Sequence, residues 1–139
     1  MRIIPMNSEN VRSVYEIEKL CFDDPWKLSI FENQLQESYS RCFVAYIDER
    51  AAGYVMLWCF DDEGEIINIA THPDFRRKGI ADALLAACMD ICKKIVLDVR
   101  ASNLAAQRLY AKHGFKDIGT RLNYYDKPKE DAIIMRLEE

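Results

Sequence analysis

The stretch Arg76-Arg77-Lys78-Gly79-Ile80-Ala81 decides the fold of this chain. It follows an apolar, strand-like run from Glu65 to Ala70 and opens a segment whose apolar residues recur at helical spacing. Unpaired backbone N–H groups converge where a helix begins, the helix dipole is positive there, and a glycine lets a ligand approach the main chain. The stretch therefore predicts a binding site for a pyrophosphate group.

The glycine spacing excludes two common phosphate-binding loops. A P-loop needs Gly-x-x-x-x-Gly-Lys-Ser/Thr, a dinucleotide fold needs Gly-x-Gly-x-x-Gly after a strand, and the chain has neither pattern. What remains is Arg-x-x-Gly-x-Ala, formed by Arg76, Gly79 and Ala81. This pattern resembles the pyrophosphate-binding loop of the GCN5-related N-acetyltransferases, which hold acetyl-coenzyme A. The alternative is a basic surface turn ahead of a helix.

Further motifs follow in the order that this family has them. After a strand-like run comes Asn103 at the start of a helix, then Tyr110 on that helix, then Gly114-Phe115. Other segments resemble one branch of the family, which acetylates the N-terminal alanine of small-subunit ribosomal protein eighteen in bacteria. These segments are Ile17 to Phe22, Pro25-Trp26, Asn123 to Tyr125 and Glu130 to Met135. The resemblance extends over nearly the whole chain.

The resemblance implies an α+β fold with a mixed, mostly antiparallel sheet of six or seven strands, flanked by about four helices. In this family the two parallel central strands splay apart, and the thioester lies in the gap. Length and composition agree with a single N-acetyltransferase domain over residues 1–139. The expected strands are Arg2 to Met6, Arg41 to Asp48, Ala52 to Phe60, Glu65 to Thr71, Ile95 to Val99, Phe115 to Asn123 and Ala132 to Leu137.

Four helices are expected between these strands. They run from a cap at Asn7 or Ser8 to about Leu20, from Leu28 to about Glu37, from Ile80 to Ile91 and from Asn103 to His113. The third is the clearest, because its apolar residues form one stripe. Gly53 is expected to weaken the start of the third strand.

Composition limits the function classes. The net charge of −4 argues against nucleic acid as a ligand and is compatible with a cationic amine. The N-terminal residues do not read as a signal peptide, and no apolar run approaches the ~20 residues of a membrane span. Five cysteines scattered through apolar segments predict reduced thiols and a cytoplasmic location. Cys88 and Cys92 read as core thiols, and we expect no metal.

The resemblance also implies roles in coenzyme binding. Backbone amides of the central strand, at Ile69, Ala70 and Thr71, would bind the pantetheine arm and polarise the thioester carbonyl. The loop residues Arg76, Arg77, Lys78, Gly79, Ile80 and Ala81 would bind the pyrophosphate. Asn103 would hydrogen-bond the coenzyme, although an asparagine there also suits a helix cap, a role for which Ser102 is available too.

Tyr110 is the predicted general acid, because a phenol of pKa about 10 suits protonation of a departing thiolate. The alternative is a core tyrosine with a satisfied hydroxyl. The base has two candidates. Asp98 interrupts an apolar strand where the branch usually has a glutamate, and its structural alternative is an ion pair with Arg100. Glu65 follows an acidic cluster, and its alternative is a solvated turn.

Aromatic residues near both ends complete the expected site. The branch resemblance places Phe22, Trp26, Tyr124 and Tyr125 beside the peptide groove, although each could simply pack a loop. The expected activity is transfer of acetyl from acetyl-CoA to a protein N-terminus, such as that of a ribosomal protein, by direct attack in a ternary complex. Two other classes stay open: an acetyltransferase for a small amine such as a polyamine or antibiotic, and a non-catalytic acyl-CoA-binding module.

Overall fold

A seven-stranded mixed sheet is the centre of the computed structural model, which describes residues 1–138. The strand order is β1-β2-β3-β4-β5-β7-β6, and every neighbouring pair is antiparallel except β4 and β5. The strands are β1 (Arg2–Pro5), β2 (Ser40–Ile47), β3 (Arg50–Phe60), β4 (Glu63–Thr71), β5 (Lys94–Arg100), β6 (Lys116–Asp126) and β7 (Lys129–Leu137). The expected mixed, mostly antiparallel sheet is confirmed.

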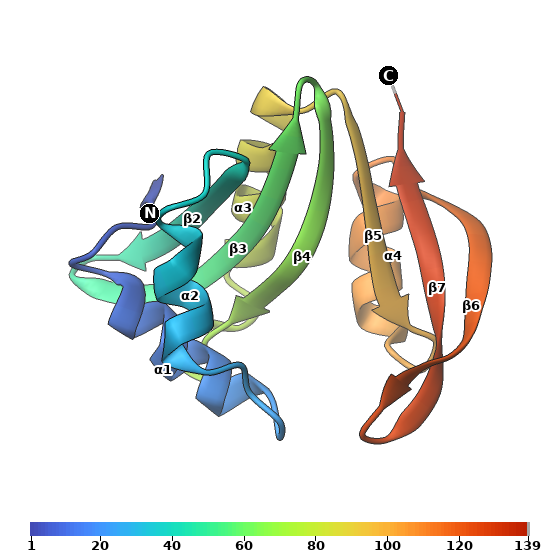
Figure 1. Cartoon of the computed structure of the whole chain (residues 1–139), viewed down its shortest axis with the longest axis horizontal. Coiled ribbons are helices and arrows are strands. Elements are labelled where there is room, and N and C mark those ends of the chain that lie inside the picture. Colours follow the sequence, from blue (N-terminus) through green and yellow to red (C-terminus); the bar gives the residue numbers. More distant parts are fainter. Residues whose placement is uncertain (139) are drawn as a thin grey trace.

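Four α-helices cover the two faces of the sheet. They are α1 (Val11–Cys21), α2 (Leu28–Gln34), α3 (Ile80–Ile91) and α4 (Leu104–Lys112), and a 3₁₀ turn (Pro73–Phe75) precedes α3. Helices α1 and α2 lie on one face, and α3 and α4 lie on the other (Figure 1). Each side has its own buried cluster, one including Phe31 and Tyr54 and the other including Leu84 and Leu97. No helix within residues 1–138 combines the length and apolar character that a membrane crossing needs.

Strands β4 and β5 pair along only part of their length. Their register runs from Glu63 opposite Lys94 to Ile66 opposite Leu97 and goes no further. Just past this point β4 has a bulge, because Leu57 pairs with Ile66 while Met56 pairs with Asn68, leaving Ile67 as the extra residue. A bulge bends and twists its strand. The two strands then part (Figure 1), which confirms the expected splay.

Three local expectations were wrong. Helix α1 begins at Val11, because the Asn7 side chain accepts from the N–H groups of Glu9 and Asn10 and so closes a turn before the helix. Helix α2 ends at Gln34, after which Leu35, Gln36 and Glu37 each donate three residues back, as in a tighter turn. Gly53 lies inside β3, where a Cβ atom would come within 2.7 Å of Ile80 and 2.8 Å of the Ala70 carbonyl. Close approach of α3, and not a weak strand, explains that glycine.

Candidate active site

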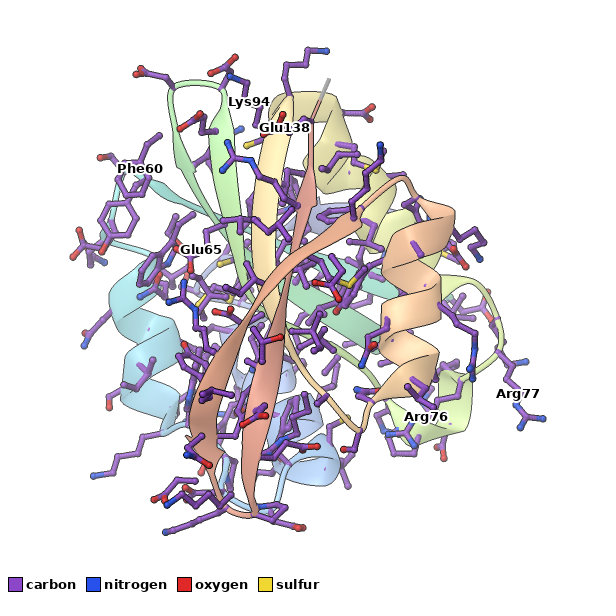
Figure 2. All side chains as sticks on the ribbon, turned by 90° about the vertical axis from the view of Figure 1, so that its right-hand side faces the viewer. Phe60, Glu65, Arg76, Arg77, Lys94 and Glu138 are labelled. Carbon is purple, nitrogen blue, oxygen red and sulfur yellow. The ribbon has the colours of Figure 1, made fainter. Side chains whose placement is uncertain are left out.

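The basic loop ahead of α3 has the geometry of an anion site. Arg77 and Gly79 both have left-handed backbones, with φ of 64° and 78°. The first hydrogen bond of α3 runs from the Ala83 N–H to the Gly79 carbonyl, 3.1 Å, so the N–H groups just before Ala83 have no helical partner. Arg77 projects from this loop into solvent (Figure 2), whereas Arg76 borders the groove with its guanidinium 3.9 Å from the Cys21 thiol. Neither they nor Lys78 make an ion pair within residues 1–138, so their charge is available to a ligand.

A continuous groove leads from this loop into the gap between β4 and β5. A first hollow contains Arg77 and Gly79 and shares Thr71, Arg76 and Ala81 with a second, of about 500 Å³. The second hollow shares five residues with a third, of about 280 Å³, which lies in the splayed part of the sheet. These shared residues are Phe22, Ile69, Asn103, Ala106 and Tyr110. One groove therefore connects the anion loop with both faces of the sheet.

The backbone of β4 points two amides toward this gap. The N–H of His72 donates to the Ala52 carbonyl of β3, 2.8 Å. Because bonding alternates along an antiparallel pair, Ala70 also bonds toward β3, whereas Ile69 and Thr71 point their N–H groups toward β5. The Ile69 N–H is already bonded to Asn68 Oδ1 at 3.1 Å, so Thr71 fits the expected amide role and Ile69 does not, while Ala70 borders the groove without offering its backbone.

Tyr110 lies between the two inner hollows with its ring buried at 6% exposure. Its ring packs against Phe115, with centroids 5.8 Å apart. No group within residues 1–138 hydrogen-bonds its hydroxyl, which argues against the alternative of a core tyrosine with a satisfied hydroxyl. Burial, and secondarily the charge of Tyr125, raises the pKa of Tyr110 to about 12. The phenol is therefore protonated at neutral pH.

Asn103 caps α4, since its Oδ1 accepts from the Ala106 N–H at 3.1 Å. Asn103 and not Ser102 is thus the capping residue, and the Ser102 N–H donates to the Glu130 carboxylate, 2.8 Å. The Asn103 side chain still borders both inner hollows, and its amide nitrogen has no partner within residues 1–138. One end of the side chain can therefore cap the helix while the other donates to a ligand.

Asp98 borders the innermost hollow from β5, with its side chain 16% exposed. Its Oδ1 accepts from Nε of Arg121 at 3.1 Å. The structural alternative for Asp98, an ion pair with Arg100, is not formed, because Arg100 pairs with Glu130, 3.1 Å, and donates to the carbonyls of Lys127 and Pro128. Arg100 thereby ties the β6–β7 hairpin to the end of β5.

Glu65 and Tyr124 lie outside this groove, and Lys78, although part of the loop before α3, does not border it. Glu65 shares a face with Asp98, because it pairs with Val96 in parallel register, but it borders a separate hollow with Phe60 and Lys94. Figure 2 shows Glu65 and Phe60 on the opposite flank of the molecule from Arg76 and Arg77. Tyr124 is 54% exposed and does not border the groove.

The other expected aromatic residues border the innermost hollow. Phe22 and Trp26 reach it from the connection between α1 and α2, and Tyr125 reaches it from β6. The guanidinium of Arg100 lies 4.3 Å from the centre of the Tyr125 ring. Burial, followed by the charge of Asp98, raises the pKa of Tyr125 to about 12. This end of the groove is thus lined by aromatic rings with carboxylates beside them.

A buried polar network at the same hollow was not expected. Glu18 is the one buried charged side chain within residues 1–138, at 2% exposure. One of its oxygens accepts from the Tyr54 hydroxyl and the Asn68 amide, and the other accepts from the Trp26 N–H. In the sequence Glu18 looks like a surface position of an amphipathic helix. The branch resemblance included Ile17 to Phe22 and Pro25-Trp26 but gave Glu18 no role.

No group of three or more His, Cys, Asp and Glu side chains within residues 1–138 is placed to share a metal ion. Cys88 and Cys92 are both buried, as expected of core thiols. The groove offers backbone amides, a phenol, the Cys21 thiol and carboxylates. Together with an anion site at one end of the groove, these groups suit acyl transfer from a phosphate-bearing donor.

Comparison with known proteins agrees with this geometry. The sequence model of the Acetyltransferase (GNAT) family matches residues 11–115. A Bacillus subtilis protein, provisionally named [ribosomal protein bS18]-alanine N-acetyltransferase, is 38% identical over 94% of this chain and 90% of its own length. The Escherichia coli (strain K12) [ribosomal protein bS18]-alanine N-acetyltransferase is 34% identical over 97% of this chain and 95% of its own length.

Solved structures give the same picture. The crystal structure of the Escherichia coli ribosomal-protein-S18-alanine N-acetyltransferase superposes with a TM-score of 0.90 at 32% identity, covering 98% of this chain and 92% of that one. Arabidopsis thaliana NAA60 in complex with acetyl-CoA has a TM-score of 0.83 at 17% identity, covering 97% and 96%, and so shares the fold. The molecule is an N-acetyltransferase. It belongs to the GNAT acetyltransferase family, which uses acetyl-CoA, and it is related to the bS18-alanine N-acetyltransferases.

Proposed function

We propose that this chain, as a single N-acetyltransferase domain, transfers an acetyl group from acetyl-CoA to the N-terminal α-amine of a protein. The proposed acceptor is an N-terminal alanine, such as that of a small-subunit ribosomal protein in the cytoplasm. The observation that carries the proposal is the continuous groove, which has an anion loop at one end and aromatic and carboxylate groups at the other. The names of the bacterial relatives support the choice of acceptor.

The donor side of the reaction uses the main chain. The N–H groups at the start of α3, with Arg76, Arg77 and Lys78, bind the pyrophosphate. Remote binding energy of this kind positions the reacting carbon. The Thr71 N–H then stabilises the oxyanion that forms on the thioester carbonyl.

The acceptor side supplies the proton transfers. Asp98, directly or through a water, takes a proton from the acceptor ammonium group. The neutral amine attacks the thioester carbon, the C–N bond forms, and the C–S bond breaks. Tyr110 donates its proton to the departing thiolate. An N-terminal amine has a pKa of about 8 and so offers a neutral fraction near pH 7 that a lysine side chain, near 10.4, does not.

A competition experiment tests the acceptor. The protein is mixed with acetyl-CoA, an Ala-starting peptide of ribosomal sequence, spermidine, free lysine and an aminoglycoside, and products are separated by mass. We expect the peptide to have the highest kcat/KM, and the same peptide with a blocked N-terminus but a free lysine to be unmodified. A higher kcat/KM for spermidine or the aminoglycoside than for every peptide would identify the enzyme as a small-amine acetyltransferase.

A further inference from the structure

The Glu18 carboxylate lies where four parts of the chain meet. It comes from α1 and accepts from the backbone N–H of Trp26 at 3.0 Å, from the Asn68 side-chain amide at 2.8 Å and from the Tyr54 hydroxyl. Tyr54 belongs to β3 and Asn68 to β4. Asn68 also donates to the Tyr54 oxygen at 2.9 Å, so the three side chains form a closed network.

Two partners of this carboxylate belong to opposite sides of the proposed reaction. Trp26 borders the acceptor side, and its loop is fixed to the protein body through this N–H. Asn68 is the first residue after the bulge in β4, and its Oδ1 accepts from the N–H of Ile69, 3.1 Å. A chain of hydrogen bonds thus runs from the acceptor loop through Glu18 to the donor strand.

Packing alone does not explain a carboxylate at this place. Burying an ionised group is unfavourable unless it is paired or fully hydrogen-bonded. Glu18 has no cation partner within residues 1–138, and all its hydrogen-bond donors are neutral groups. A carboxylate can accept from three donors at once, whereas a glutamine of the same size must point an N–H group at one of them.

We propose that Glu18 is a positioning residue that holds the Trp26 loop against the Asn68 segment of β4, so that the acceptor and donor sites keep a fixed relation. This inference rests on the proposed transfer to a peptide amine. It assigns no proton transfer to Glu18. It predicts that loss of the carboxylate weakens peptide binding while leaving the distant pyrophosphate loop intact.

The position of Trp26 can be measured without any reaction. The chain has two tryptophans, so Trp58→Phe leaves Trp26 as the only indole reporter. In that background we compare Glu18→Gln with Tyr54→Phe. Both variants change the same buried network. Only Glu18→Gln introduces an amide N–H group, which faces the Trp26 N–H in one orientation of the side chain and the Tyr54 and Asn68 donors in the other. We expect Glu18→Gln to increase acrylamide quenching of Trp26 at least twofold, and Tyr54→Phe to leave it unchanged.

Kinetics test the consequence in the tryptophan-containing protein. Glu18→Gln should raise the KM for the peptide about tenfold, the range for losing one charge-assisted hydrogen bond. The calorimetric Kd for coenzyme A and the thermal midpoint should match those of Tyr54→Phe, whose peptide KM should stay within about twofold of the parent. Unchanged Trp26 quenching in Glu18→Gln, or equal effects of the two variants, would overturn the inference. A parent protein that acetylates no peptide would instead refute the proposed function, while the quenching result still decides whether Glu18 anchors the loop.

Discussion

The Tyr110 hydroxyl has the features expected of a general acid. Its ring is buried against Phe115, its hydroxyl is unpaired within residues 1–138, and its pKa is raised to about 12. The proposed reaction needs Tyr110 in its protonated form, and a raised pKa keeps the phenol protonated to higher pH.

Tyr110→Phe should lower kcat about 10²-fold or more while the affinity for coenzyme A stays unchanged. The parent kcat should show no alkaline decrease from this group below about pH 11. If the parent and Tyr110→Phe had equal turnover, Tyr110 would only pack in the core.

Asp98 and Glu65 are distinguished by where they lie. Asp98 borders the groove beside Tyr110, whereas Glu65 borders another hollow. Asp98→Asn should therefore slow turnover and remove the acidic limb of the pH–rate profile. Glu65→Gln is the control and should leave that limb in place. The opposite pattern would make Glu65 the base, and a limb that survives in both variants would mean that the amine loses its proton to solvent before it binds.

The position of a residue at the groove could be predicted from the sequence where that residue belonged to a family motif. Tyr110 and Asn103 lie at the groove as the family pattern predicted. The partner considered for Asp98 was Arg100, but Arg121 reaches Asp98 from β6, across β7. Such a contact leaves no local signal in the sequence. Glu18 was missed for the same reason, since its partners Tyr54 and Asn68 are distant in the sequence.

The loop before α3 shows at the scale of an element how backbone conformation prepares a site. Gly79 has φ of 78°, and a Cβ atom added there would meet no protein atom within 4 Å. Gly79→Ala should therefore destabilise the fold through backbone strain alone, by about 1–2 kcal/mol. Gly79→Asn is the matched control, because asparagine tolerates the left-handed region.

Coenzyme A binding separates strain from crowding in these variants. Gly79→Asn should recover most of the thermal stability, yet both variants should bind coenzyme A more weakly than the parent, because each side chain enters the space assigned to the pyrophosphate. Calorimetry and thermal unfolding of the three proteins give the comparison. If the stable Gly79→Asn protein bound coenzyme A as tightly as the parent, the pyrophosphate would not bind at this loop.

Elements with a strong periodic signal were predicted within a few residues. The apolar stripe of α3 and the run of β5 are examples, because their burial repeats at 3.6 and 2 residues. The start of α1 was wrong because the side chains of Asn7 and Asn10 each accept from the other's backbone N–H, which closes a turn before the helix, and Asn10 makes no side-chain cap. The splay of β4 and β5 came from the family resemblance, since the bulge at Ile67 has no sequence signature.

At the scale of the whole molecule, the two helices beside the coenzyme groove are joined by Asp82 of α3. Its Oδ1 accepts from Lys112 at 2.7 Å and His113 at 2.8 Å, both at the end of α4. Lys112, and then His113, lowers the pKa of Asp82. A lowered pKa means that this stabilisation is present above the ordinary aspartate pKa of about 4 and is lost as the pH falls through the lowered value.

The Asp82→Asn variant measures that contribution. Because Asp82 is 39% exposed, solvent screening limits its contribution to below about 1 kcal/mol. The thermal midpoint of the variant should be lower than that of the parent at pH 7, and the difference should shrink toward pH 3 and at high salt. A difference that is constant with pH would assign the effect to packing.

The groove also decides between two overall mechanisms. Its ends lie on different faces of the sheet, so donor and acceptor can be bound together and react directly. The alternative is a covalent acetyl-enzyme, for which Cys21 is the candidate nucleophile, because it borders the groove with its thiol 3.3 Å from the Thr71 carbonyl. Burial raises the pKa of Cys21 despite the nearby Arg76, which keeps it a neutral thiol and a poor nucleophile.

We therefore expect a ternary-complex mechanism. Double-reciprocal plots for acetyl-CoA and peptide should intersect, and Cys21→Ser should retain kcat/KM within about threefold, since a serine hydroxyl keeps the hydrogen bond to Thr71. Mass spectrometry of the parent after incubation with acetyl-CoA alone should detect no acetyl group on Cys21. Parallel plots together with an acetyl adduct that disappears in Cys21→Ser would instead mean that the enzyme passes the acetyl group through this thiol.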